Sequence, residues 1–253
     1  KFSPDVAFIT NPTFLHIRSA IKCLNLGMKV FIEKPLGSSL RDLSQLLKLS
    51  KKKQRVTYVA YNRRFHPVID RLKTYFQRGT FLHMNIISSS FYPDWREGDY
   101  KARYTAKKKM GGGIVLDLSH ELDYTGYLTG GVISIKGQFS KRSDLTVDSE
   151  DFADILVQTK LGPANIHLNF FSQKTENKIT VNFKDITVTG DLINSIVEEW
   201  KGGRMIKREK FAKDRNVSFE AQLEYFFKNI NNPKMMNNIS EAAPLFKKII
   251  NFK

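Results

Sequence analysis

The sequence predicts an α/β region followed by an α+β region that is built on a mainly antiparallel sheet. The chain has 253 residues, more than the roughly 150 of one average domain. Up to about residue 62, short apolar strands alternate with helical segments, a pattern typical of parallel βαβ units. From residue 81 onward, strands follow one another through short connections, as they do in antiparallel sheets. We therefore divide the chain into residues 1–62 and residues 63–253.

The first region contains three buried strands and two helices. In chain order, the expected elements are strand Val6–Thr10, helix Thr13–Leu26, strand Lys29–Glu33, helix Leu40–Lys53 and strand Val56–Ala60. Ser39 and Asp42 form a capping-box pattern at the start of the second helix. Parallel sheets bind ligands at the carboxyl ends of their strands. We therefore expect a site where these ends lie, at Thr10-Asn11-Pro12, Glu33-Lys34-Pro35 and Tyr61-Asn62-Arg63.

The second region contains most of the predicted strands. In chain order, we expect helix Pro67–Phe76, strand Phe81–Phe91, a polar loop Tyr92–Met110, a helix from the glycines at 111–113 to Leu128, strands Val132–Phe139, Phe152–Thr159, Ala164–Phe171, Lys178–Phe183 and Ile186–Thr189, and helices Phe219–Ile230 and Glu241–Ile250. The Leu161-Gly162-Pro163 turn joins two of these strands as a hairpin.

Ionisable side chains gather in the stretch GGGIVLDLSHELDY, residues 111–124. On a helix, residues three or four apart share a face, so Asp117 lies beside both His120 and Glu121. Such a stripe facing inward is costly unless its groups are paired or line a cleft. The glycines let the backbone approach a ligand closely. We interpret this helix as the wall of an active site.

The composition limits the other classes of function. Lys and Arg exceed Asp and Glu by 16, which favours an anionic partner or, equally simply, a solvated basic face. No zinc-finger, basic-zipper or RNA-binding signature accompanies the charge. The apolar runs are too short to span a bilayer, and the single cysteine, Cys23, is typical of the cytoplasm. Because the chain begins directly on a buried strand, we expect that an N-terminal part is missing.

Three stretches resemble one known family. They are ITNPTFLHIRSAIKCLNLGMKVFIEKPL, VAYNRRFHP and GGGIVLDLSHELDY, in this order, and the likeness to the glucose–fructose oxidoreductase/inositol dehydrogenase/MocA (Gfo/Idh/MocA) family covers almost the whole chain. The resemblance implies an NAD(P)-dependent oxidoreductase that acts on CH–OH groups of a sugar, sugar nucleotide or related polyhydroxy substrate. It also implies the later part of a Rossmann domain, without its Gly-rich phosphate loop, followed by an open-faced sheet domain. Because an exposed sheet face usually needs a cover, we expect homodimers or homotetramers that form through this sheet.

The resemblance assigns Lys34 to polarising the substrate oxygen, a role that fits an ammonium at a strand end. The family pattern separates Asp and His by four positions, whereas Asp117 and His120 are three apart. Alignment on the glycines places Glu121 at the catalytic position, and alignment on the downstream H-x-x-D places His120 there. We choose His120 because its ordinary pKa suits proton transfer near neutrality. Asp117 is the third catalytic candidate, and we expect it to orient His120 or to bind a sugar hydroxyl. We expect His120 to face Lys34 and Glu121 to face a basic side chain, Arg63 or Arg64.

Further candidates line the expected groove. For the cofactor, NAD or NADP, they are Thr10, Asn11, Pro12, His16, Glu33, Lys34 and Asn62. For the substrate, they are Arg63, Asp94, Trp95, Tyr104, Asp117 and His120. HELDY lacks the second histidine of the zinc motif H-E-x-x-H, so no metal site is expected. Two alternatives remain open: a catalytically silent relative that acts as a scaffold, and an anion- or nucleic-acid-binding protein, although our reading includes neither a nucleic acid nor a membrane as partner.

Overall fold

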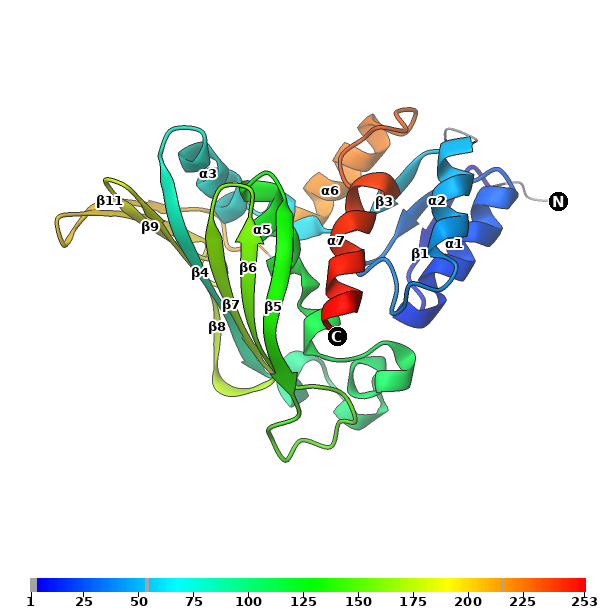
Figure 1. The fold of residues 1–253 in the computed structure, drawn as a ribbon, viewed down its shortest axis with the longest axis horizontal. Coiled ribbons are helices and arrows are strands. Elements are labelled where there is room, and N and C mark those ends of the chain that lie inside the picture. The colour runs from blue at the N-terminus through cyan, green and yellow to red at the C-terminus, as the bar shows by residue number, and fades with distance from the viewer. Residues whose placement is uncertain (1–3, 53–54, 215) are drawn as a thin grey trace.

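A computed structural model describes residues 4–52, 55–214 and 216–253. It contains a small parallel sheet and a large mixed sheet, with the C-terminal helix lying between them (Figure 1). The α/β and α+β fold class predicted from the sequence is confirmed. Among the described helices, none has the length and apolarity needed to cross a membrane.

The parallel sheet has the order β1–β2–β3, formed by Val6–Ile9, Lys29–Ile32 and Thr57–Val59. Because successive side chains of a strand point to opposite faces, Val30 and Ile32 pack on one side and Phe31 on the other. Helices α1 (His16–Asn25), α2 (Leu43–Lys52) and α7 (Ile239–Phe252) contribute to the first core, and α6 (Val217–Lys228) to the second. The two last helices of the chain thus complete the packing of its first sheet.

The large sheet has the order β11–β10–β9–β8–β4–β7–β6–β5. Its strands are β4 (Phe81–Phe91), β5 (Val132–Ser140), β6 (Phe152–Thr159), β7 (Pro163–Asn169), β8 (Phe171–Phe183), β9 (Thr187–Asp191), β10 (Ile196–Lys201) and β11 (Arg204–Lys210). Only the β4–β7 pair is parallel among the described strand pairs of this sheet.

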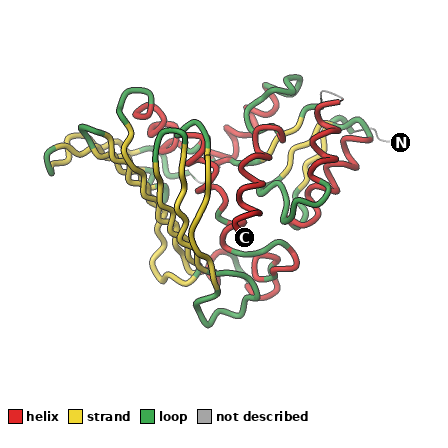
Figure 2. Tube along the Cα trace, viewed as in Figure 1, coloured by secondary structure: helices red, strands yellow, loops and turns green. Residues whose placement is uncertain are grey.

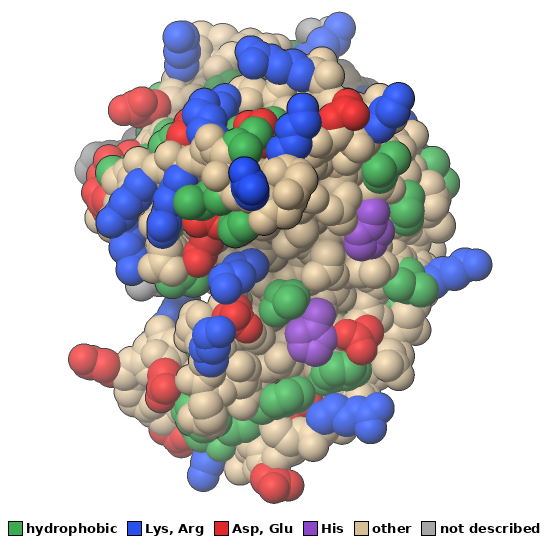
Figure 3. Space-filling model, turned by 90° about the vertical axis from the view of Figure 1, so that its left-hand side faces the viewer, with side chains coloured by type: hydrophobic (Ala, Val, Ile, Leu, Met, Phe, Trp, Pro, Cys, Tyr) green, Lys and Arg blue, Asp and Glu red, His purple; other side chains and the backbone are tan. Residues whose placement is uncertain are grey.

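Helices cover one face of the large sheet and leave the other open (Figure 2). Helices α3 (Pro67–Phe76), α4 (Ile114–Asp117) and α5 (Ser119–Leu128) contact its covered face and close the largest apolar core of the described residues. On the side of the molecule seen in Figure 3, hydrophobic, basic and acidic side chains are interspersed. This one-sided cover places α4 and α5 between the large sheet and the parallel sheet.

The sequence did not predict the hairpin of β10 and β11, and it predicted β8 too short. Strand β8 begins at Phe171, seven residues before the expected Lys178. Strand β11 is almost entirely exposed and carries charges at most positions. It has no buried apolar face, so the alternation that identifies a strand is missing from its sequence. The expected loop at 92–110 also folds into four short 3₁₀ turns.

Three predicted helices begin three residues later than expected. Helix α1 begins at His16, after a 3₁₀ turn over Thr13–Leu15. Helix α2 begins at Leu43, whose N–H donates to the Leu40 carbonyl, and Asp42 lies in the left-handed region with φ of 61°. Because this turn delays the helix, Ser39 lies outside it, and Asp42 pairs with Arg18 at 3.3 Å instead of capping. The expected end at Lys53 lies outside the described residues. The predicted helix from residue 111 begins only at Ile114, after Gly113 with φ of 119°.

Candidate active site

Lys34 lies at the carboxyl end of β2, and its ammonium donates a hydrogen bond to the backbone carbonyl of Asp117. This contact joins the end of a parallel strand to α4, 83 residues away in the sequence. The Lys34-Pro35 peptide bond is cis, a possibility the sequence allowed. Burial lowers the pKa of Lys34, and the negative charges of Asp117, Glu33 and Glu121 oppose that lowering. The structure therefore brings the predicted strand end and the predicted helix together.

A break at Leu118 makes the Lys34 contact possible. Leu118 has φ of −99° and ψ of 30°, so the expected single helix is divided into α4 and α5. In a continuous helix, the Asp117 carbonyl would accept the N–H of Glu121. Here that N–H donates to Leu118 at 3.3 Å, and the Asp117 carbonyl is free for Lys34. The interruption was not predicted, because the apolar spacing continues through it.

The Asp117 carboxyl group is buried and only half satisfied. Its residue is 6% exposed, Thr105 Oγ1 donates to Oδ1 at 3.2 Å, and Oδ2 has no partner among the described residues. Burial raises the pKa of Asp117 to about 6, against the opposing charge of Lys34. A buried carboxyl with one oxygen free and a pKa near neutrality is typical of a site that binds a polar ligand.

His120 lies on the first turn of α5 with its ring against Tyr61, the residue that follows β3 and Ala60 (centroids 5.8 Å apart, planes at 81°). Its Nδ1 is buried and has no partner among the described residues. Burial lowers the pKa of His120 well below its ordinary value, and the charges of Lys34 and Arg63 lower it further. The imidazole is therefore neutral at pH 7 and able to accept a proton.

Glu121 points toward the large sheet, where Asn177 Nδ2 of β8 donates to Oε1 at 3.1 Å. The residue is 2% exposed, and burial raises the pKa of its carboxyl group. The positive charge of Arg63, one of the two basic residues expected near Glu121, opposes this rise. The expected pairing with Arg64 is wrong, because two other carboxylates occupy that guanidinium.

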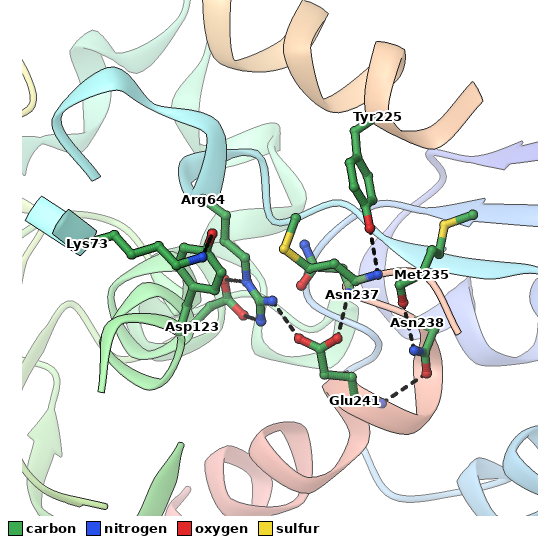
Figure 4. A network of polar contacts seen from close by, with 10 residues as sticks. Arg64, Lys73, Asp123, Tyr225, Met235, Asn237, Asn238 and Glu241 are labelled. Atoms are coloured by element: carbon green, nitrogen blue, oxygen red, sulfur yellow. Dashed lines mark hydrogen bonds and ion pairs between the residues drawn. The ribbon is translucent and has the colours of Figure 1, made fainter. Parts of the chain in front are cut away.

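Arg64 forms a clamp between α5 and α7, in which Arg64 and Asp123 are buried and Glu241 is partly exposed (Figure 4). Its Nε and Nη2 donate to Asp123 of α5 at 2.9 and 2.8 Å, and its Nη1 donates to Glu241 of α7 at 2.6 Å. Planar guanidinium and carboxylate groups suit this bidentate geometry. Glu241 also accepts the N–H of Asn237 at 2.9 Å, which continues the network into the turn before α7. The clamp fixes α5, and with it His120, relative to the parallel sheet.

The end of β1 supplies a second wall. Asn11 donates to Ser19 at 2.9 Å, and its Oδ1 is buried without a partner among the described residues. His16 is buried, with Nδ1 2.8 Å from the Pro35 carbonyl oxygen and Nε2 2.7 Å from that of Asn11. The ring thus ties the turn after β1 to the turn after β2. Thr10 is exposed, and Pro12 is half-buried.

The remaining candidate residues are only partly gathered around Lys34 and Asp117. Glu33 accepts the backbone N–H of Lys34 at 3.2 Å, and the Asn62 amide donates to Ser218 of α6 at 2.9 Å. Burial raises the pKa of the Tyr104 phenol, and the negative charge of Asp117 raises it further. Trp95 packs its ring against Tyr92 and Phe170 within the large core. Asp94 is exposed, and no contact in the described part of the chain brings it or Trp95 to Lys34.

Two residues of the site were not predicted, and a third, Tyr61, was expected at a strand end but without a role. The structure places the Tyr61 ring against that of His120. Thr105 lies in the expected loop, and nothing in the spacing sets it apart from its polar neighbours. Lys253, at the end of α7, acts on Asp117 through its charge, although 136 residues separate the two. No local sequence pattern reports such a distant contact.

Comparison with known proteins places the chain in a family. Residues 1–61 match the model described as "Oxidoreductase family, NAD-binding Rossmann fold", and residues 69–189 match the "GFO/IDH/MocA C-terminal domain". The chain belongs to the Gfo/Idh/MocA family. Members of this family are NAD(P)-dependent oxidoreductases, so the resemblance read from the motifs is confirmed.

Individual Gfo/Idh/MocA relatives show how far the likeness extends. Myo-inositol 2-dehydrogenase from Thermotoga maritima is 28% identical over 128 residues, which are 50% of this chain and 36% of the relative. Scyllo-inositol 2-dehydrogenase (NAD⁺) from Bacillus subtilis is 30% identical over 131 residues, 51% of this chain and 36% of the relative. The aligned parts are thus about a third of the length of these curated relatives.

Solved structures share the fold over nearly the whole chain. Levoglucosan dehydrogenase in complex with NADH superposes with a TM-score of 0.83 at 15% identity, covering 98% of this chain and 77% of that one. UDP-N-acetylglucosamine 3-dehydrogenase from Acidithiobacillus ferrooxidans has a TM-score of 0.77 at 18% identity, covering 98% and 79%.

Four buried polar atoms of the candidate site have no partners in the part of the chain that the structure describes: Asn11 Oδ1, Asp117 Oδ2, His120 Nδ1 and Glu121 Oε2. Asn11 follows the carboxyl end of β1, where parallel sheets bind ligands, and the other three residues lie on α4 and α5. Such unpaired polar atoms fit a polar ligand, such as the nicotinamide end of a dinucleotide. Among the described residues, no group of three or more His, Cys, Asp or Glu side chains is arranged to hold a metal ion.

Proposed function

We propose that the protein containing this chain is an NAD(P)-dependent dehydrogenase or reductase of a CH–OH group in a sugar, sugar nucleotide or related polyhydroxy compound. One observation carries the proposal: the Lys34 ammonium donates to the carbonyl of Asp117, three residues before His120, in a chain whose first 61 residues match an NAD-binding domain. The relatives named for inositol, levoglucosan and UDP-N-acetylglucosamine support the substrate class.

The roles follow from charge and protonation. When bound, NAD or NADP supplies the hydride acceptor or donor. The neutral ring of His120 takes the proton of the substrate hydroxyl during oxidation and returns it during reduction. The Lys34 ammonium, which now donates to the Asp117 carbonyl, holds the substrate oxygen and stabilises the negative charge that develops on it. Asp117 and Tyr104 bind further hydroxyl groups, and Asn11, Glu33 and the turn after β1 hold the cofactor.

His120 is the residue that exchanges the proton with the substrate, and Glu121 has a structural role in packing α5 against the large sheet. A carboxylate beside a developing alkoxide would oppose the reaction, whereas a neutral imidazole adds no like charge. Glu121 is engaged by Asn177 on the sheet side of α5. Arg63 is half-buried, and its charge acts on both His120 and Glu121, which suits a residue at the edge of the substrate site.

The test is a hydride-transfer screen of the protein that contains this chain. NAD and NADP are each combined with myo-inositol, scyllo-inositol, levoglucosan and UDP-N-acetylglucosamine, and reduction is followed by absorbance of the nicotinamide. We expect reduction of at least one cofactor by a polyhydroxy substrate, with simple monohydric alcohols as the matched control. Binding of a dinucleotide without hydride transfer to or from any of these compounds would instead favour the catalytically silent alternative.

Self-association through the large sheet stays a prediction. Leu156 is 58% exposed on β6, on the face of the sheet opposite to the buried Ile155 and Val157. A second copy covering this face would shield it from water. We expect the molar mass in solution to be at least twice that of the chain and Leu156→Glu to lower it. A parent chain that is monomeric at micromolar concentration would contradict this.

A further inference from the structure

A short acidic segment, Asp148–Asp151, supports Asp117 from behind. Ser149 Oγ donates to the Thr105 carbonyl at 3.1 Å, and the Ile114 N–H donates to the Glu150 carbonyl at 3.0 Å. Thr105 is the hydrogen-bond donor to the Asp117 carboxyl group, and Ile114 begins the helix on which Asp117 lies. The segment therefore fixes both the side-chain partner and the backbone of Asp117.

The Glu150 side chain lies against the bare backbone of Gly113. A Cβ at Gly113 would lie 2.4 Å from Glu150 Oε1, closer than any carbon and oxygen atoms can pack. Glu150 is only 6% exposed, so its carboxylate needs a partner in the interior. The glycine before α4 thus makes room for a buried charge directly behind the Asp117 turn.

Lys253 supplies that partner from the other half of the molecule. Its Nζ is 2.5 Å from Glu150 Oε1, and its side chain is 14% exposed. Lys253 follows α7, whose Ala243 and Phe246 are buried in the core of the parallel sheet. The pair therefore connects the parallel sheet to the segment that supports Asp117.

The Lys253 charge also reaches Asp117 itself. It lowers the pKa of Asp117, in the same direction as the charge of Lys34 and against the effect of burial. The other titratable groups that act on this carboxyl group are the phenols of Tyr92 and Tyr104, which are neutral at pH 7. Two cations thus act on the Asp117 carboxyl group, Lys34 from the end of β2 and Lys253 from the end of α7.

We propose that Glu150 and Lys253 are positioning residues for Asp117: Glu150 holds the Lys253 ammonium at a fixed place beside Gly113 and the start of α4, and this ion pair supports the Asp117 carboxyl group through its charge and through the backbone of residues 149–150. A role of this ion pair in catalysis rests on the proposed function. Its effect on the Asp117 carboxyl group does not, and that effect can be measured without substrate or cofactor.

The experiment follows the titration of Asp117 by ¹³C NMR in the chain labelled at aspartate carboxyl groups, with Asp117→Asn to assign its signal. Lys253→Met removes a cation, so Asp117 should titrate at higher pH than in the parent chain. Glu150→Gln removes the anion that neutralises this cation, so Asp117 should titrate at lower pH. Lys253→Arg, which keeps the charge, should restore the parent titration.

Lys247→Met is the matched control, because it removes one exposed lysine from the same helix. It should leave the Asp117 titration unchanged. If the two substitutions merely loosened the fold, the Asp117 titration would shift in the same direction in Lys253→Met and Glu150→Gln. That result would overturn the proposal, and so would an unchanged Asp117 titration in Lys253→Met. If Glu150→Gln does not fold, the pair Lys253→Met and Lys253→Arg still decides it. Absence of oxidoreductase activity would reject the proposed function and leave this titration as it stands.

Discussion

Burial acts in the same way on the four ionisable side chains of the site, and neighbouring charges distinguish them. Burial raises the pKa of Asp117 and Glu121 and lowers that of Lys34 and His120, so every one of these groups is pushed toward its neutral form. Their mutual charges oppose this effect for the acids and for Lys34, but the nearby cations reinforce it for His120. His120 is therefore the group best suited to begin a cycle as a neutral base.

The assignment of the proton to His120 can be tested against Glu121 directly. In the protein that contains this chain, His120→Gln should lower kcat by roughly 100- to 10,000-fold, the usual contribution of a general base. Glu121→Gln should keep kcat within a few-fold of the parent value, since Asn177 can still donate to its side chain. The reverse ranking would support the alignment anchored on the glycines.

Asp117 predicts a pH-dependent stability. The pKa of Asp117 in the folded chain is about 6, above its ordinary value of 3.8. Ionisation of the buried carboxyl group therefore destabilises the folded state. This destabilisation is absent below pH 3.8, grows as the pH rises, and is complete above pH 6. Asp117→Asn removes this cost, which is roughly 3 kcal/mol at 1.36 kcal/mol for each pKa unit. Urea unfolding should show the variant more stable at pH 7 and the gain shrinking toward pH 4. Asp94→Asn, at an exposed position, is the control, and a variant that is less stable at pH 7 would contradict the expectation.

Among the elements, the interrupted helix decides the geometry of the site. The break at Leu118 releases the Asp117 carbonyl toward Lys34, and the glycines before α4 admit the Glu150 carboxylate. The glycines and the ionisable stripe could be read from the sequence, because glycine and buried charge carry local signals. The break could not, because it depends on a strand end 83 residues away.

Gly113→Ala tests the packing before α4. Both the φ of 119° and the contact of 2.4 Å with Glu150 oppose a side chain there. Gly98 also has a positive φ, of 88°, but nothing lies within 4 Å of its Cβ position. Gly98→Ala should cost roughly 1–2 kcal/mol from backbone strain alone, and Gly113→Ala about 1–3 kcal/mol more from overpacking. Equal losses in urea unfolding would mean that Glu150 does not fill this space.

The clamp between η2 (Asn62–Phe65), α5 and α7 should dominate the stability of their junction. Arg64→Met leaves the Asp123 carboxylate buried without its partner and should cost about 3–5 kcal/mol. Arg18→Met breaks an exposed pair with Asp42 and should cost less than about 1 kcal/mol. Similar losses in the two variants would show that the buried clamp contributes no more than a surface pair.

At the scale of the whole molecule, the sequence predicted the two types of sheet and the family, because βαβ alternation and the glycine-rich motif are local patterns. It did not predict that α6 and α7 pack on the first sheet, since Phe226 and Phe246 carry only the signal of ordinary amphipathic helices. The exposed hairpin of β10 and β11 was missed for lack of a buried face. Of the candidate residues, Lys34, Asp117, His120 and Tyr104 come together, whereas Trp95 is part of the core.

The convergence of the two halves at Lys34 is the central claim, and turnover of Lys34→Met tests it most directly. Kinetics are measured in the protein that contains this chain, with the cofactor and polyhydroxy substrate that the screen identifies. We predict a kcat lowered roughly 100- to 1,000-fold, as for loss of one donor to a developing oxyanion, with an unfolding midpoint close to that of the parent. A kcat that stays at the parent value in a folded Lys34→Met protein would contradict the account.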